Sequence, residues 1–123
     1  MDQSLLTILH FNDAYNIEPN DDGSNGVVNF EACLTKARKK HPNNILLHSG
    51  DALSPALLNF DDSFPKGTYM IKSLNMLNIT AACMGNHEFD LKDDDNDGEP
   101  DTITRFKESN FPWLMGNILV KST

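Results

Sequence analysis

The sequence predicts an α/β fold in which β-α-β units build a largely parallel sheet. Two observations predict this class. Short apolar runs alternate with stretches of helical periodicity along the chain, and turn-forming residues separate most of them. Strands that alternate with helices in this way pair in parallel through right-handed crossovers. With 123 residues, 39% of them hydrophobic, the chain can bury a core but has room for at most one ordinary domain.

The first strand is expected at residues 4–11 (SLLTILHF), an apolar run of the length of a buried strand. Apolar residues at helical spacing then predict a helix that starts near Val27 and stops before Pro42, because proline cannot continue a helix. Residues 44–48 (NILLH) are again a short apolar run closed by turn residues, and they form the second expected strand.

The second half of the chain continues the alternation. Helical spacing of apolar residues predicts a helix at roughly 68–78, and residues 80–84 (TAACM) form the third expected strand. After an acidic loop, a short helix is expected at 102–109. Residues 111–119 (FPWLMGNIL) then supply the fourth strand. The chain contains no internal repeat.

The charge of the chain is −8 and is unevenly distributed. Residues 90–101 (DLKDDDNDGEPD) hold seven acids and one lysine, so most of the negative charge is local. This balance predicts no nucleic-acid partner and no anionic membrane partner, but it leaves room for a small anionic substrate elsewhere. No apolar run is as long as a membrane span.

Two further features bear on the compartment. Cys33 and Cys83 both lie in apolar patterns and are expected to be buried free thiols, which favours a reducing environment. The first residues (MDQSLLTILHF) lack the basic region, the long apolar region and the cleavage site of a signal peptide. On these grounds a cytoplasmic location is expected.

Polar side chains follow three of the expected strands, in the stretches FND, SGD and GNHE. Because parallel strands end at the same edge of a sheet, we expect Asp13, Asp51, Asn86 and His87 to lie at one edge. A single aspartate after a strand is more typical of a turn, and a lone histidine of the surface. Three strand ends with the same chemistry favour a site for a divalent metal or a phosphate instead.

These stretches resemble the signature blocks of the calcineurin-like metallophosphoesterases. The blocks HFND, LLHSGD and MGNHEFD carry the resemblance, and LTILHFND, LNMLNITAACMGNHEFD and FPWLMGNI are similar to the 5′-nucleotidase branch in order and spacing. The likeness spans roughly Leu5 to Ile118. It implies that residues 1–123 are a single partial domain, the N-terminal portion of a catalytic domain. The fold would then be the first portion of an α/β/β/α sandwich.

The resemblance also implies an activity, the hydrolysis of phosphate esters such as nucleotides with two divalent metal ions (Mn, Zn, Mg, Co or Fe). Asp13 would bind the first metal, Asp51 would bridge both, and Asn86 would bind the second. Attack would come from a metal-bound hydroxide. His87 would act beside the leaving oxygen, and Asp90 would orient His87.

The chain departs from the family pattern in two ways. Tyr15 stands where the family usually has a metal-binding histidine. Tyr15 could be a tyrosinate ligand of iron(III) or only a hydrogen-bond donor, or its presence could mark a weakened first metal site. The histidine blocks that complete both metal sites in the family are also absent, since His10 and His48 are expected to pack or to support ligands. The remainder of the catalytic domain is therefore an expected partner, and this portion alone is expected to turn over little. The family is often secreted or periplasmic.

The acidic loop at 91–101 is expected to be an insertion, and it suggests a second function. Its acids alternate around Gly98 in a D-x-D-x-D-G-x-x-D pattern that resembles calcium-binding loops. The calcium candidates are Asp93, Asp95, Asp97 and Asp101. Two positions differ from an EF-hand loop: Pro100 stands where an apolar residue is usual, and Thr104 stands where the bidentate glutamate is usual. The alternatives are a solvated insertion without calcium, and a non-catalytic metal- or calcium-binding module with a degenerate phosphoesterase site.

Overall fold

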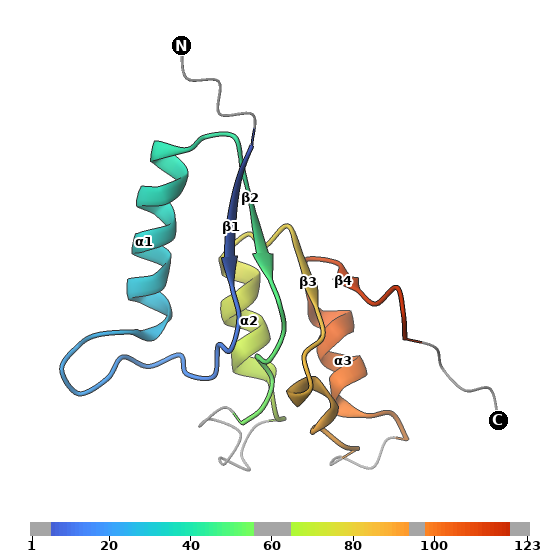
Figure 1. The fold of residues 1–123 in the computed structure, drawn as a ribbon. Coiled ribbons are helices and arrows are strands. Elements are labelled where there is room, and N and C mark those ends of the chain that lie inside the picture. Colours follow the sequence, from blue (N-terminus) through green and yellow to red (C-terminus); the bar gives the residue numbers. More distant parts are fainter. Residues whose placement is uncertain (1–5, 56–64, 94–97, 119–123) are drawn as a thin grey trace.

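A parallel four-stranded sheet with helices between successive strands forms the core of the protein (Figure 1). The computed structural model describes residues 6–55, 65–93 and 98–118. The strands are β1 (Thr7–Phe11), β2 (Asn44–His48), β3 (Ala81–Cys83) and β4 (Trp113–Leu114), and they lie side by side in that order. The helices are α1 (Gly26–Lys40), α2 (Thr68–Met76), α3 (Asp101–Glu108) and the 3₁₀ helix η2 (His87–Phe89). The α/β class and the parallel pairing are confirmed.

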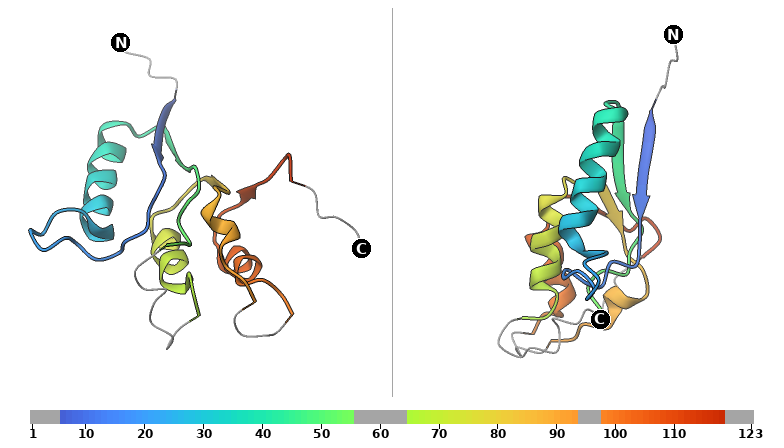
Figure 2. Two further views of the ribbon diagram at one scale, coloured as in Figure 1. Left: turned by 60° about the horizontal axis from the view of Figure 1, so that its bottom comes forward. Right: turned by 90° about the vertical axis from the view of Figure 1, so that its left-hand side faces the viewer.

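All three α-helices cover the same face of the sheet, and the opposite face carries no layer among the described residues (Figure 2). Side chains of β1 consequently alternate between half-buried and exposed, and Ile8 is 60% exposed. The prediction that the first strand is buried was therefore wrong. Leu6 before β1 and Leu114 on β4 are exposed as well.

The outer strands are shorter than predicted. β1 begins at Thr7, and residues 4 and 5 of the predicted strand lie outside the described residues. β4 consists of Trp113–Leu114 alone, and of the predicted 111–119 only residue 119 falls outside the described part. Phe111 packs in the core at 6% exposure, but residues 114–118 are exposed and the run does not continue as a strand beyond Leu114.

One row of side chains crosses the whole sheet in register. Phe11 pairs with His48, His48 with Ala82, and Ala82 with Trp113. The rings of Phe11 and His48 stack at 4.6 Å between centroids, and the His48 and Trp113 rings meet edge to face at 6.4 Å. The small Ala82 leaves the space for that second contact. At the β1 end of the row, the ring of Phe30 on α1 contacts the ring of Phe11.

The helices are joined to this core by apolar faces and by a few side-chain caps. Met70, Ile71 and Leu74 of α2 are buried at helical spacing. Arg38, in the last turn of α1, donates from Nη2 to the carbonyl oxygens of Leu77 (2.7 Å) and Asn78 (3.0 Å). These carbonyls lie just past the end of α2, where they lack helical partners, so the contact caps α2 and ties it to α1.

Two expectations about the surface can be compared with the structure. Cys33 is exposed and Cys83 is half-buried, so the prediction of two buried thiols was wrong. Cys33 reaches the surface because α1 buries only Leu34 fully. None of the helices in the described ranges combines the length and the apolar content needed to traverse a lipid bilayer.

The buried imidazole predicts a pH-dependent stability. His48 is 1% exposed, and burial lowers its pKa from the ordinary value of 6.5 because the charged form is poorly solvated in the core. As the pH falls below about 6.5, the unfolded chain binds a proton at His48 that the folded core does not. The free energy of unfolding should therefore fall by up to about 1.4 kcal/mol per pH unit from this group.

Replacing His48 with phenylalanine should remove this contribution. Urea denaturation between pH 5 and pH 8 measures it as the difference in slope between the two proteins. His41→Gln, which removes an imidazole at the end of α1 rather than one in the core, serves as the control and should keep the wild-type dependence. Equal slopes for His48→Phe and wild type would contradict the assignment.

Candidate functional site

β1, β2 and β3 end at the same edge of the sheet (Figure 1), and the predicted site residues lie in the segments that follow these strands. The segments that follow β1 and β2 are bonded to each other. The amide of Asp13 donates to the Gly50 carbonyl (3.1 Å), and the amide of Ala14 donates to the Asp51 carbonyl (3.0 Å). The backbones of Asp13 and Asp51 therefore lie side by side at this edge. Both residues have left-handed dihedral angles, with φ of 54° and 61°.

The loops after β2 and β3 approach each other through two glycines. A Cβ atom on Gly50 would lie 2.7 Å from the Cα of Gly85, and Gly50 also has a positive φ of 93°. A Cβ atom on Gly85 would lie 2.6 Å from the Cγ of Asp51. Separations this short do not occur between non-bonded atoms, so both positions need glycine for the Asp51 side chain to sit where it does.

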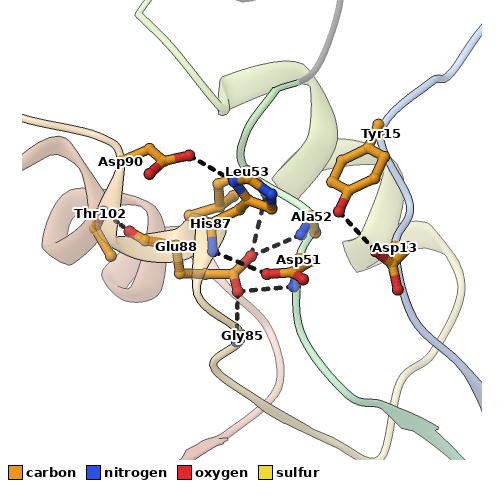
Figure 3. Close-up of polar contacts among 10 residues, drawn as sticks. All are labelled: Asp13, Tyr15, Asp51, Ala52, Leu53, Gly85, His87, Glu88, Asp90 and Thr102. Carbon is orange, nitrogen blue, oxygen red and sulfur yellow. Dashed lines mark hydrogen bonds and ion pairs between the residues drawn. The ribbon is translucent and has the colours of Figure 1, made fainter.

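The Asp51 carboxylate is fixed by the loop after β3. The backbone amide of His87 donates to Asp51 Oδ1 at 2.8 Å, as Figure 3 shows. One carboxylate oxygen therefore faces the protein backbone. The contact joins two residues that are 36 positions apart in the sequence.

Glu88 lies beneath this contact and received no role in the sequence-based prediction. Its side chain is 0% exposed. Its Oε2 accepts from the amides of Asp51 (2.8 Å) and Gly85 (2.7 Å). Its Oε1 accepts from those of Ala52 (2.6 Å) and Leu53 (3.2 Å). The spacing from Glu88 back to Gly85 is that of a capping-box acid and its N-cap, which is the sequence signal that could have identified it.

His87 and Asp90 form a hydrogen-bonded pair in the loop after β3. Nδ1 of His87 and Oδ2 of Asp90 are 2.7 Å apart, and the side chains are 35% and 49% exposed. The hydrogen bond to Asp90 raises the pKa of His87 above its ordinary value, and the same bond lowers the pKa of Asp90.

Tyr15 contacts the other predicted site residues from the side of β1. Its hydroxyl donates to Asp13 Oδ1 at 2.7 Å, and the side chain of Asn12 donates to the other oxygen of Asp13. The bond to Asp13 raises the pKa of Tyr15 above its ordinary value, because the acceptor carboxylate favours the protonated phenol. The Tyr15 ring meets the His87 ring edge to face at 5.9 Å. Tyr15 is thus a hydrogen-bond donor here, and a tyrosinate ligand stays one of the alternatives.

Asn86 lies in the same loop, immediately before η2, and its carbonyl accepts from the amide of Phe89 at 3.2 Å. Carboxylate and amide oxygens are donors that hard divalent metals take, so the chemistry of Asp13, Asp51 and Asn86 fits such ions. Across the part of the chain that the structure describes, however, no three His, Cys, Asp or Glu side chains are grouped closely enough to hold a metal ion.

The two histidines inside the strands take different places. His48 packs in the core, as expected. His10 is exposed, and its Nε2 lies 2.7 Å from Ser49 Oγ, across the ends of β1 and β2. The hydrogen bond between His10 and Ser49 supports the loop that carries Asp51.

The structure describes two of the four calcium candidates, Asp93 and Asp101. Asp95 and Asp97 lie outside the described residues. Oδ2 of Asp93 accepts from the amide of Gly98 at 2.9 Å. Asp101 is buried at 4% exposure and begins α3, with its amide bonded to the Lys92 carbonyl. Calcium binding by this loop stays a prediction.

The fold and this edge define a class: a parallel α/β protein with carboxylates and an imidazole gathered where its strands end. The sequence profile of the calcineurin-like phosphoesterases matches residues 6–121, and the chain belongs to that family. This confirms the resemblance carried by the blocks around Asp13, Asp51 and His87.

Individual relatives agree with the family. The 5′-nucleotidase of Bos taurus is 34% identical over 127 residues, which covers 94% of this chain and 21% of the bovine protein. The solved structure of the NAD nucleotidase of Haemophilus influenzae matches with a TM-score of 0.65 and 28% identity, over 89% of this chain and 20% of that one. The calcineurin-like phosphoesterase YfkN of Bacillus subtilis has the same fold, with a TM-score of 0.61 at 20% identity, over 87% of this chain and 35% of that one. The chain spans about a fifth of the length of the nucleotidases it matches.

The contact between the two glycine loops predicts a specific loss of stability. Gly85→Ala should push the Asp51 carboxylate aside and lower the free energy of unfolding by about 1–3 kcal/mol, because the added methyl group has no space. Gly116→Ala is the matched control, since a Cβ atom there meets nothing within 4 Å. Urea denaturation measures both, and equal stabilities would show that the loops are not packed as described.

The pair formed by His87 and Asp90 predicts a shift in titration. In metal-free protein, Asp90→Asn should lower the pKa of His87 towards its ordinary value, because the amide no longer stabilises the imidazolium. NMR of the His87 ring protons between pH 5 and pH 9 measures the change. Asp21→Asn removes an exposed acid from the β1–α1 loop and should leave the curve in place. An unchanged curve in Asp90→Asn would show that the pair does not form in solution.

Proposed function

We propose that the protein of which this chain forms part hydrolyses phosphate monoesters, with nucleotides as the substrate class. The observation that carries the proposal is the grouping of Asp13, Asp51 and the pair of His87 and Asp90 at one edge of the sheet. Family membership supports phosphoester hydrolysis, and relatives named 5′-nucleotidase support the nucleotide class.

Asp13, Asp51 and Asn86 would hold two divalent metal ions, of the Mn, Zn, Mg, Co or Fe type, with further ligands from outside this chain. When bound, such ions neutralise the charge of the phosphate and supply a nucleophile from water. A carboxylate such as Asp51 suits the position between two cations, because its two oxygens and its charge hold them close together. The neutral Asn86 amide leaves the site positive enough to attract a phosphate.

His87 would deliver a proton to the leaving oxygen. Its raised pKa means that a larger fraction of the imidazole carries that proton at neutral pH. Asp90 would hold the ring in orientation through Nδ1, which leaves Nε2 for the substrate. Both side chains are partly exposed, so a substrate can reach them.

The remainder of the catalytic domain is the proposed partner for the uncovered face of the sheet. Ile8, Leu6 and Leu114 on that face are exposed apolar side chains of a kind that packs against a further layer. The same layer would add metal ligands to Asp13, Asp51 and Asn86, since the described residues hold no group of three His, Cys, Asp or Glu side chains close enough to bind a metal ion.

Turnover of the full-length protein tests the proposal. With Mn²⁺ and AMP, or a bis-aryl phosphodiester, His87→Asn should lower kcat by about 10²–10⁴-fold, the range typical of a lost general acid. Asp51→Asn should suppress turnover at least as strongly and also weaken Mn²⁺ binding. Asp21→Asn is the control for loss of an acid and should retain the wild-type rate.

Unchanged rates in both variants would remove the catalytic assignment. Calcium binding confined to residues 93–101, without any transition metal at the strand edge, would favour the non-catalytic module instead.

A further inference from the structure

Glu88 differs from the other acids of the site because it is the one sealed from solvent. Its side chain is 0% exposed, whereas the Asp90 side chain two residues later is 49% exposed. A buried carboxylate is costly unless both oxygens receive hydrogen bonds, and bonds from amides to a charged acceptor are among the strong ones. Glu88 receives four, two on each oxygen.

The four donors are distributed so that the carboxylate joins two loops. Three of the amides belong to consecutive residues after β2, namely Asp51, Ala52 and Leu53. The fourth belongs to Gly85, after β3. At its other end, the Glu88 carbonyl accepts from Thr102 Oγ1 of α3 at 2.5 Å (Figure 3). Glu88 thus connects three elements: its side chain joins the loops after β2 and β3, and its backbone carbonyl bonds to α3.

Two of the hydrogen bonds that hold Asp51 come from residues 87 and 88. Glu88 holds its backbone amide, and the backbone amide of His87 holds its side-chain Oδ1. The distance between the Asp51 carboxylate and the His87 ring therefore depends on where Glu88 sits.

We propose that Glu88 is the positioning residue of this site, setting Asp51 and His87 at the separation that the reaction needs without touching the substrate. The proposal rests on the proposed hydrolase function for its kinetic consequences, and on the amide contacts alone for its structural ones.

Glu88→Gln tests it, because the amide keeps the size of the side chain but turns one acceptor oxygen into a donor that faces two backbone amides. In the full-length protein with Mn²⁺ and AMP, kcat should fall by about 100-fold, the usual cost of a small misplacement of catalytic groups. At saturating Mn²⁺, KM should change by less than about threefold, since Glu88 itself does not touch the substrate. Mn²⁺ affinity, measured by EPR titration, should fall by about tenfold or more through the displaced Asp51.

Two further variants separate positioning from general stability. Glu108→Gln is the matched control: it breaks the ion pair with the buried Arg105 (3.1 Å) on α3, away from the site. It should lower the melting temperature while kcat and Mn²⁺ affinity stay at wild-type values. Glu88→Asp keeps the charge on a shorter arm, so it should restore part of kcat, and it replaces Glu88→Gln if the glutamine variant does not fold.

A readout in metal-free protein distinguishes the failure of this inference from the failure of the proposed function. Hydrogen exchange should speed up selectively at the amides of Asp51, Ala52, Leu53 and Gly85 in the Glu88 variants. If the wild type hydrolyses no phosphate ester but binds Mn²⁺, faster exchange together with weaker Mn²⁺ binding would still support positioning by Glu88. Wild-type exchange, or wild-type kcat and Mn²⁺ affinity in a folded Glu88 variant, would overturn it. Absence of Mn²⁺ binding in the wild type would overturn it too.

Discussion

A single buried carboxylate closes the gap between two strand ends, and the geometry of the whole edge follows from it. Parallel strands stop hydrogen-bonding where they end, so the loops beyond them carry backbone amides in need of acceptors. Glu88 supplies both of its oxygens to four such amides and brings the loops together. Gly50 and Gly85 make this approach sterically feasible. The position of Asp51, and its contact with the amide of His87, are consequences of that packing.

The two faces of the sheet differ in what packs against them. On the helix side, the row from Phe11 through His48 to Trp113 fixes the lateral order of the strands, and a buried neutral imidazole fills its middle. The other face shows apolar side chains such as Ile8 to solvent among the described residues. The candidate site lies beyond the carboxyl ends of the strands, where the layer proposed for the second face would add ligands to those of this chain.

Local patterns were sufficient to predict the element order and the edge. Apolar runs, helical spacing and turn residues are properties of neighbouring residues, and the aspartates and the GNHE stretch follow strands directly. The exposure of Ile8 could not be predicted in this way, because it depends on what covers the sheet rather than on the strand itself. The short β4 was missed since an apolar run does not reveal whether it pairs or packs. Glu88 was missed for a related reason: three of its four partners are 35 to 37 positions away.

The left-handed backbone at Asp13 and Asp51 limits which amino acids can replace them during evolution. Most side chains pay roughly 1–2 kcal/mol to adopt that conformation, while glycine, asparagine and aspartate enter it readily. A descendant that had lost all catalysis would therefore still tend to carry one of these three residues there. Asparagine or glycine at these positions would satisfy the turn alone, whereas aspartate would satisfy both the turn and the proposed chemistry.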